Sequence, residues 1–180
     1  MKFVTFFLTI TFSIFSHAVV DKAPKCDDYF SVQQTDGRYQ RMSKGLAQDP
    51  LSGLTWYRCG AGQTWLNGQC QGDPLLLPFE EAQTWAANST LADFNDWRVP
   101  ETDDMTTLVE ADCKSPSINT RVFSGIEPEV YWSSESNFWM RPMAWSFFFY
   151  RGHYFSKQAK GEPLRFMFCL LYTSPSPRDS

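Results

Sequence analysis

The C-terminal part of the chain alternates large aromatic residues with polar ones, a period of two that is typical of half-buried strands. We predict strands there over residues 130–136, 143–150, 153–157 and 164–168. Arg151-Gly152 separates the second of these strands from the third and suits a tight turn. An antiparallel sheet is therefore expected late in the chain.

Earlier in the chain the apolar residues recur at helical spacing instead. Residues 79–88 place Phe79, Ala82, Trp85 and Ala86 on one face, which we expect to be buried. Pro78 suits the first turn of this helix, because proline lacks the N–H that a helix start leaves unbonded. A first helix is predicted here.

A second helix is predicted after Pro100, with Thr102 as its cap and an apolar stripe that begins at Met105. Upstream, residues 45–48 and 54–59 flank an Asp-Pro-Leu-Ser-Gly turn and predict a hairpin. The predicted fold class is therefore α+β, with two helices early and an antiparallel sheet late.

Both ends of the chain differ in character from the middle. Residues 1–18 combine an early lysine, an apolar run and Ser-His-Ala, which together predict a cleaved signal peptide and export. Residues 169–180 resemble the translation of a sequencing adapter, and we expect them not to be native. Residues 19–168 are then the size of a single domain with one core.

Before residue 169 the chain has four cysteines, Cys26, Cys59, Cys70 and Cys113, an even number that an oxidising compartment would pair. Four cysteines allow three connectivities. We favour Cys59 with Cys70, because the glycine-rich segment between them reads as a loop whose ends can meet, and Cys26 with Cys113 as the remaining pair. No C-x-x-C spacing supports a zinc site.

The net charge of the chain limits which classes of ligand are expected. The formal net charge is −4, and no run of lysine or arginine supplies a basic patch, so nucleic acid is not an expected ligand. The apolar run near the N-terminus is too short to cross a membrane, and no transmembrane span is expected. The helix dipole explains the adjacent acids Asp103 and Asp104, so we predict no metal site and no cofactor.

Several motifs join aromatic residues to polar ones at regular points along the chain. Asp96-Trp97-Arg98-Val99-Pro100 predicts a locked loop in which Trp97 fills the core while Asp96 and Arg98 bond to the backbone or to each other. Trp132 and Trp145, on neighbouring predicted strands, are expected to be core residues or a cross-strand pair. These residues have a structural interpretation rather than a catalytic one.

These motifs, together with the Asp-Pro-Leu-Ser-Gly-Leu-Thr-Trp segment at 49–56, resemble one family, the C-terminal domain of Legionella-type collagen-like adhesins. The resemblance covers about residues 45–168. It implies a C-type-lectin-like fold and an exported bacterial adhesion module, in the periplasm or at the cell surface, that binds a glycan or a protein without catalysis. The best-known member implies sulfated glycans as ligands, which the acidic charge of this chain disfavours.

The segment between the predicted strands 130–136 and 143–150 is the expected ligand site. Phe138, Trp139 and Arg141 lie there with no periodicity that would bury them, and exposed aromatic and arginine side chains are enriched at binding hot spots. The alternative is an enzyme on a lectin-like scaffold, related to the oxidases that generate formylglycine in sulfatases. That alternative needs free cysteines, so pairing of all four would count against it.

Overall fold

The computed structural model describes residues 23–171, and the predicted signal peptide lies outside this range. Its helices and strands, with two short 3-10 turns, are in chain order α1 (Cys26–Gln33), β1 (Gln40–Arg41), η1 (Ser43–Gly45), β2 (Leu46–Asp49), β3 (Leu54–Tyr57), β4 (Thr64–Leu66), β5 (Gln69–Gln71), α2 (Phe79–Ala87), η2 (Leu91–Asp93), α3 (Thr102–Thr106), β6 (Val130–Ser136), β7 (Met143–Phe148), β8 (His153–Ala159) and β9 (Cys169–Leu171).

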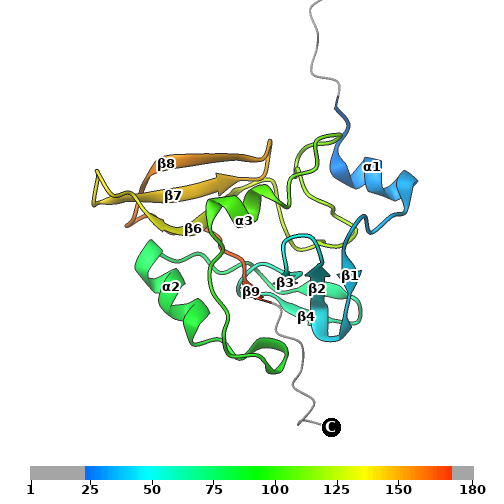
Figure 1. The fold of residues 1–180 in the computed structure, drawn as a ribbon, viewed down its shortest axis with the longest axis horizontal. Helices are drawn as coiled ribbons and strands as arrows, with labels where there is room; N and C mark the ends of the chain where they lie inside the picture. Colours follow the sequence, from blue (N-terminus) through cyan, green and yellow to red (C-terminus); the bar gives the residue numbers. More distant parts are fainter. Residues whose placement is uncertain (1–22, 172–180) are drawn as a thin grey trace, which may run out of the picture.

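The described strands form antiparallel sheets, with the orders β1-β2-β3-β9, β4-β5 and β6-β7-β8. Figure 1 shows the β6-β7-β8 sheet on one side of the molecule and β1 to β4 on the other, with β9 between them. Helices α2 and α3 both pack against β6. The fold is therefore mixed α+β, as predicted.

Two large clusters of buried side chains and a small third one around Cys26, Phe30 and Cys113 form the interior of the described part, and the C-terminal segment belongs to both large clusters. Phe166 and Phe168 lie in the cluster beneath α2, whereas Met167 and Cys169 lie in the cluster beneath α3. Successive side chains of an extended segment point to opposite sides. Residues 166–169 therefore join the two halves of the core.

Several predicted elements have the expected place and nearly the expected bounds. The strand over 130–136 is β6, the helix over 79–88 is α2, and the hairpin around residues 49–53 is β2 with β3. Strand β7 ends at Phe148 rather than at Tyr150, while β8 runs on to Ala159. Helix α1 was not predicted, because its eight residues bury only Cys26 and Phe30 and so carry little periodicity.

The strand predicted over residues 164–168 is wrong as a regular strand. The backbone there exchanges hydrogen bonds with several segments in turn: Leu164 bonds Leu77, the Arg165 carbonyl accepts from Trp132, and the Phe166 carbonyl accepts from Ala61. Regular pairing begins only at Cys169, opposite Trp56. Residues 169–171 thus extend the fold beyond the expected domain end at Phe168, and their adapter origin stays a prediction.

Both favoured disulfides are formed. Cys59 pairs with Cys70, their Cα atoms 5.5 Å apart, and Cys26 pairs with Cys113, their Cα atoms 4.9 Å apart. The second bridge ties α1 to the loop after α3. Within the range 23–171, no helix is long and apolar enough to cross a membrane.

Candidate functional site

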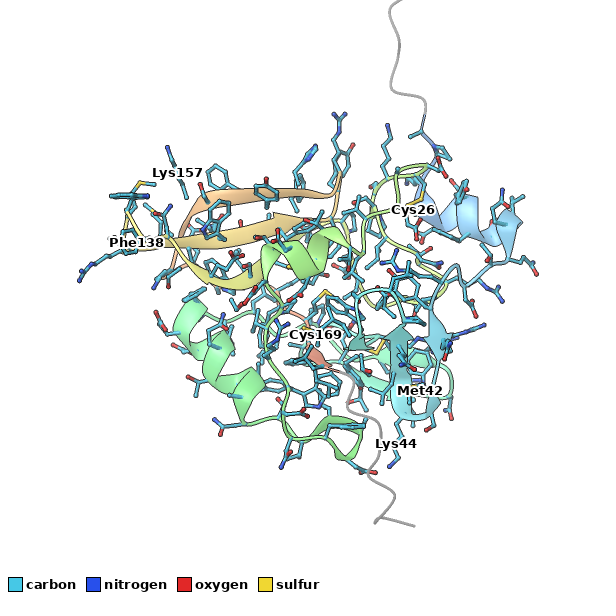
Figure 2. The ribbon with its side chains drawn as sticks, viewed as in Figure 1. Cys26, Met42, Lys44, Phe138, Lys157 and Cys169 are labelled. Atoms are coloured by element: carbon cyan, nitrogen blue, oxygen red, sulfur yellow. A yellow bond between two sulfur atoms is a disulfide. The ribbon has the colours of Figure 1, made fainter. Side chains whose placement is uncertain are left out.

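The loop between β6 and β7 projects aromatic side chains into solvent. Phe138 is 82% exposed and Trp139 is 88% exposed, and their rings meet edge to face with centroids 5.1 Å apart. Figure 2 shows Phe138 at the far end of the β6-β7-β8 sheet. Arg141 is exposed in the same loop. The three predicted ligand residues are thus close in the chain and accessible.

One buried side chain holds this loop in shape. The Oδ1 atom of Asn137 accepts hydrogen bonds from the backbone N–H groups of Trp139, at 3.0 Å, and Met140, at 2.9 Å. Its Nδ2 donates to the carbonyl of Ser156, at 2.7 Å, across on β8. Because these bonds fix the backbone beneath the exposed rings, the loop needs less ordering when a ligand binds.

The base of the loop is joined to the start of α2. The backbone N–H of Lys160 donates to the carbonyl of Pro142, at 3.0 Å. The Nζ atom of Lys160 lies 2.9 Å from a carboxylate oxygen of Glu80 and 4.7 Å from the ring centroid of Phe79. The aromatic loop and the outer surface of α2 are therefore neighbours.

A groove of about 810 Å³ lies over α2, and sequence reasoning missed it. Its walls include Leu77, Glu80, Glu81, Thr84, Trp85 and Asn88. The prediction that Trp85 belongs to the buried face of the helix is wrong, since this side chain is 36% exposed. Glu81, Trp85 and Asn88 recur at helical spacing, a mixed polar and aromatic face that could have been recognised.

The indole of Trp85 packs against the C-terminal segment. Its ring stacks on Phe168 with centroids 5.4 Å apart and an interplanar angle of 21°, and it meets Phe166 edge to face. The C-terminal segment thus covers one face of the ring. The same contact presents the other face to the groove.

The Asp96–Pro100 motif forms a structural loop in which Arg98 bonds the backbone as predicted, at the carbonyl of Val99 (3.4 Å), but its ion-pair partner was not expected. Trp97 is buried, and its indole N–H donates to the carbonyl of Leu91, at 3.0 Å. Arg98 pairs with Asp104, at 2.7 Å, rather than with Asp96, which is exposed. Asp96 and Arg98 lie two positions apart, but α3 begins just beyond Pro100 and brings the Asp104 carboxylate to the Arg98 guanidinium, while Asp96 stays in solvent.

Helix α3 is capped from its own first turn and not by the Thr102 side chain. The carboxylate of Asp104 accepts the backbone N–H of Glu101, at 2.8 Å. The backbone N–H and the hydroxyl of Thr102 instead donate to Glu135 on β6, at 2.8 and 2.6 Å. The carboxylate of Asp104 thus bonds both Arg98 and the N-terminus of α3. No group of three metal-ligating side chains was found in the described part of the chain.

The two tryptophans of the predicted strand pair differ in environment. Trp132 is fully buried, and its indole N–H donates to the carbonyl of Leu77, at 2.8 Å. Trp145 is only partly buried and packs on Tyr154 of β8, with ring centroids 5.6 Å apart. The first is a core residue, and the second belongs to a cross-strand pair whose other member, Tyr154, is itself exposed.

The cysteines offer little reactivity. The four cysteines before residue 169 are all paired. The thiol of Cys169 is free but fully buried, and burial raises its pKa to about 12. Because the thiolate is the nucleophile, this group is poorly reactive in the folded protein.

Comparison with known proteins identifies the family. The model of the Lcl C-terminal domain, a domain associated with adhesins, matches residues 45–168. No curated protein and no solved structure matches the chain. The matched range includes α2, the Asp96–Pro100 motif, both central tryptophans and the aromatic loop. The chain therefore belongs to the Lcl C-terminal domain family.

Proposed function

We propose that this protein is an exported binding module that recognises a glycan through Phe138, Trp139 and Arg141. The observation that carries the proposal is the pair of aromatic rings, each more than four-fifths exposed, on a loop whose backbone is held by Asn137. Exposing two large rings to water is unfavourable unless a ligand covers them. A rigid support makes them ready for binding.

The chemistry of the loop suits a saccharide. Sugar rings expose C–H groups that pack on flat aromatic faces, while their hydroxyls need hydrogen-bond partners, which the guanidinium of Arg141 supplies as a donor. Aromatic and arginine side chains together are enriched among residues that dominate binding energy. A protein ligand is the competing outcome, and a screen that presents both classes decides between them.

Export and a lectin-like scaffold fit the same function. Two disulfides are formed, one across a short loop and one between cysteines 87 positions apart, and such bridges form and persist in oxidising compartments. We propose a location in the periplasm or at the cell surface. The lectin-like character of the mixed fold belongs to this proposal and rests on the family resemblance alone.

The enzyme alternative has little support from the described cysteines. An oxidase of the formylglycine-generating kind depends on reactive thiols, and the four cysteines before residue 169 form disulfides. Cys169 is buried with a raised pKa. The proposed role is therefore binding without catalysis.

Trp139→Ala tests the proposal. We expect a glycan array probed with the whole protein to show ligands whose affinity falls by about tenfold or more in this variant, the loss typical of a hot-spot residue. The free energy of unfolding should change by no more than about 0.5 kcal/mol, since the side chain is exposed. Isothermal calorimetry and urea unfolding measure the two quantities.

Leu51→Ala is the matched control, because Leu51 is 81% exposed in a different hairpin loop. It should leave glycan affinity unchanged. Equal binding by Trp139→Ala and the parent protein would refute the aromatic loop as the ligand site. Binding of protein partners alone would replace the glycan with the competing class of ligand.

A further inference from the structure

The groove over α2 has the properties of a sugar subsite, and neither the family assignment nor the sequence motifs point to it. Its volume of about 810 Å³ lies in the range of small-molecule sites. Trp85 forms its aromatic surface, fixed by stacking on Phe168 with the rings 5.4 Å apart. An indole held on one face and open on the other is a platform for a second flat or ring-shaped group.

The charged residues that line the groove are both acidic. Glu80 is paired with Lys160. Glu81 is exposed and has no ion-pair partner among residues 23–171. An unpaired carboxylate beside an aromatic platform favours a ligand that carries a positive charge and disfavours sulfate or phosphate groups.

Polar groups near the acids can orient a ligand that stacks on Trp85. Thr84 and Asn88 lie one helical turn apart on the same wall, and the side-chain oxygen of Asn88 is left to accept, because its Nδ2 donates to the carbonyl of Thr84, at 2.9 Å. Apolar contact comes from Leu77 and Leu91, which also line the groove. Such a combination of one stacking surface, acceptors and a carboxylate fits a sugar ring that bears a free amine.

The groove adjoins the aromatic loop. Lys160 bonds the carbonyl of Pro142 at the loop base and the carboxylate of Glu80 at the groove rim. Figure 1 shows α2 beside the β6-β7-β8 sheet, on the side of the molecule where the β6–β7 loop lies. An extended oligosaccharide stacked on the loop would therefore be able to continue along α2.

We propose that the groove over α2 is a second subsite of the same ligand site, in which Trp85 stacks an amino-substituted sugar and Glu81 pairs with its ammonium group. This inference rests on the proposed glycan-binding function and specifies its ligand class: an extended glycan with free amino groups rather than a sulfated one. Trp85 and Glu81 are ligand contacts, and Lys160 links the two subsites.

Partly deacetylated and fully acetylated chito-oligosaccharides of equal length are suitable probes, since they share one sugar backbone and differ in whether a ring carries a charged amine or a neutral N-acetyl group. Calorimetry on the whole protein, at a mildly acid pH that keeps the sugar amines protonated, measures both affinities. Glu81→Lys should lower the affinity for the amine-bearing oligomer by about tenfold or more while changing the affinity for the acetylated oligomer little. Added salt should also lower the affinity for the amine-bearing oligomer more than that for the acetylated one.

Asp28→Lys is the matched control for charge reversal. Asp28 and Glu81 are each the third residue of a helix, exposed and acidic, but Asp28 lies on α1. The two variants change net charge and helix-dipole interactions equally. Asp28→Lys should therefore leave both affinities within about twofold of the parent protein if the effect of Glu81→Lys is local.

Trp139→Ala separates failure of the groove from failure of the aromatic loop. If Trp139→Ala lowers the affinity for both oligomers while Glu81→Lys behaves like Asp28→Lys, the groove subsite is wrong and the loop site stands. If neither oligomer binds the parent protein, the loop site and the groove subsite are both wrong for this ligand class. Preferential binding of a sulfated oligosaccharide would overturn the amine specificity while leaving glycan binding in place.

Discussion

At the scale of single residues, this protein uses tryptophan in opposite ways. Trp97 is 2% exposed, and its ring lies against Tyr57, Phe94 and Phe168. Trp139 is 88% exposed and touches only its neighbour Phe138 among the ring contacts of the described residues. The same side chain therefore stabilises the fold at one position and is available to a ligand at the other.

We expect Trp97→Ala to destabilise the protein by about 3–5 kcal/mol, because it empties a packed site and removes the indole hydrogen bond to Leu91. Urea unfolding followed by circular dichroism measures the change. Variant protein that remains folded should keep its glycan affinity. A normal free energy of unfolding combined with lost binding would show that Trp97 is a ligand contact and not a core residue.

At the scale of elements, the β2–β3 hairpin depends on one buried carboxylate. The side chain of Asp49 is fully buried and accepts hydrogen bonds from Arg38 at 2.9 Å, Ser52 at 2.9 Å and the backbone N–H of Leu51 at 3.0 Å. Gly53 closes the turn with a φ of +71°, a conformation that other residues adopt with strain. The Asp-Pro-Leu-Ser-Gly sequence thus specifies both the turn and the register of the strands.

The pKa of Asp49 makes this contribution dependent on pH. Burial by itself would raise the pKa, but the hydrogen bonds from Arg38, Ser52 and Leu51 outweigh it and hold the pKa below the ordinary value of 3.8. The folded state therefore binds the Asp49 proton less tightly than the unfolded state does. The stabilisation is complete above the unfolded-state pKa and is lost as pH falls through the folded-state pKa.

Asp49→Asn should cost about 1.5–3 kcal/mol at neutral pH, the range for hydrogen bonds to a charged group. The difference between parent and variant should shrink once pH falls below the ordinary aspartate range. Urea unfolding at a series of pH values measures it, with the exposed Asp96→Asn as the control that should change little. A difference that stays constant down to low pH would contradict the assigned cause.

At the scale of the whole molecule, covalent and backbone links hold the two halves together. The C-terminal segment contributes side chains to both core clusters, and Cys26–Cys113 closes a long loop that on the chain-entropy model stabilises by about 4.5 kcal/mol. Arg98 and Cys169 also exchange backbone hydrogen bonds, at 3.0 and 3.1 Å. Unfolding of either half is therefore expected to release the other.

Thiol titration of the full chain tests this arrangement. The native protein should react very slowly, because Cys169 is buried and burial raises its pKa to about 12. Denaturation without reductant should release one reactive thiol per chain, and peptide mapping should place it at Cys169. Additional thiols would show that one of the two disulfides is not formed in solution.

Much of the local structure was readable in the residues because it depends on near neighbours. Alternation predicts β6, helical spacing predicts α2, and turn residues predict the β2–β3 hairpin. Each of these signals lies within the element it predicts or a few positions from it. Even the pairing of Cys59 with Cys70 followed from a short loop. The exposed loop at Phe138 was likewise recognised because no local pattern would bury it.

Contacts between distant segments decided the rest. Trp85 shares the helical spacing of Phe79 and Ala82. Its environment depends on the distant Phe168, which covers one face of the indole and leaves the other face to the groove. Arg98 forms its ion pair with Asp104 and not with its near neighbour Asp96, because the packing of α3 brings Asp104 to the Arg98 guanidinium. Residues 164–168 read as a strand, yet they lie between two sheets and bond to several partners in turn. Spacing along a chain records which residues can share a face, whereas the partner that covers that face is set by the packing of the whole fold.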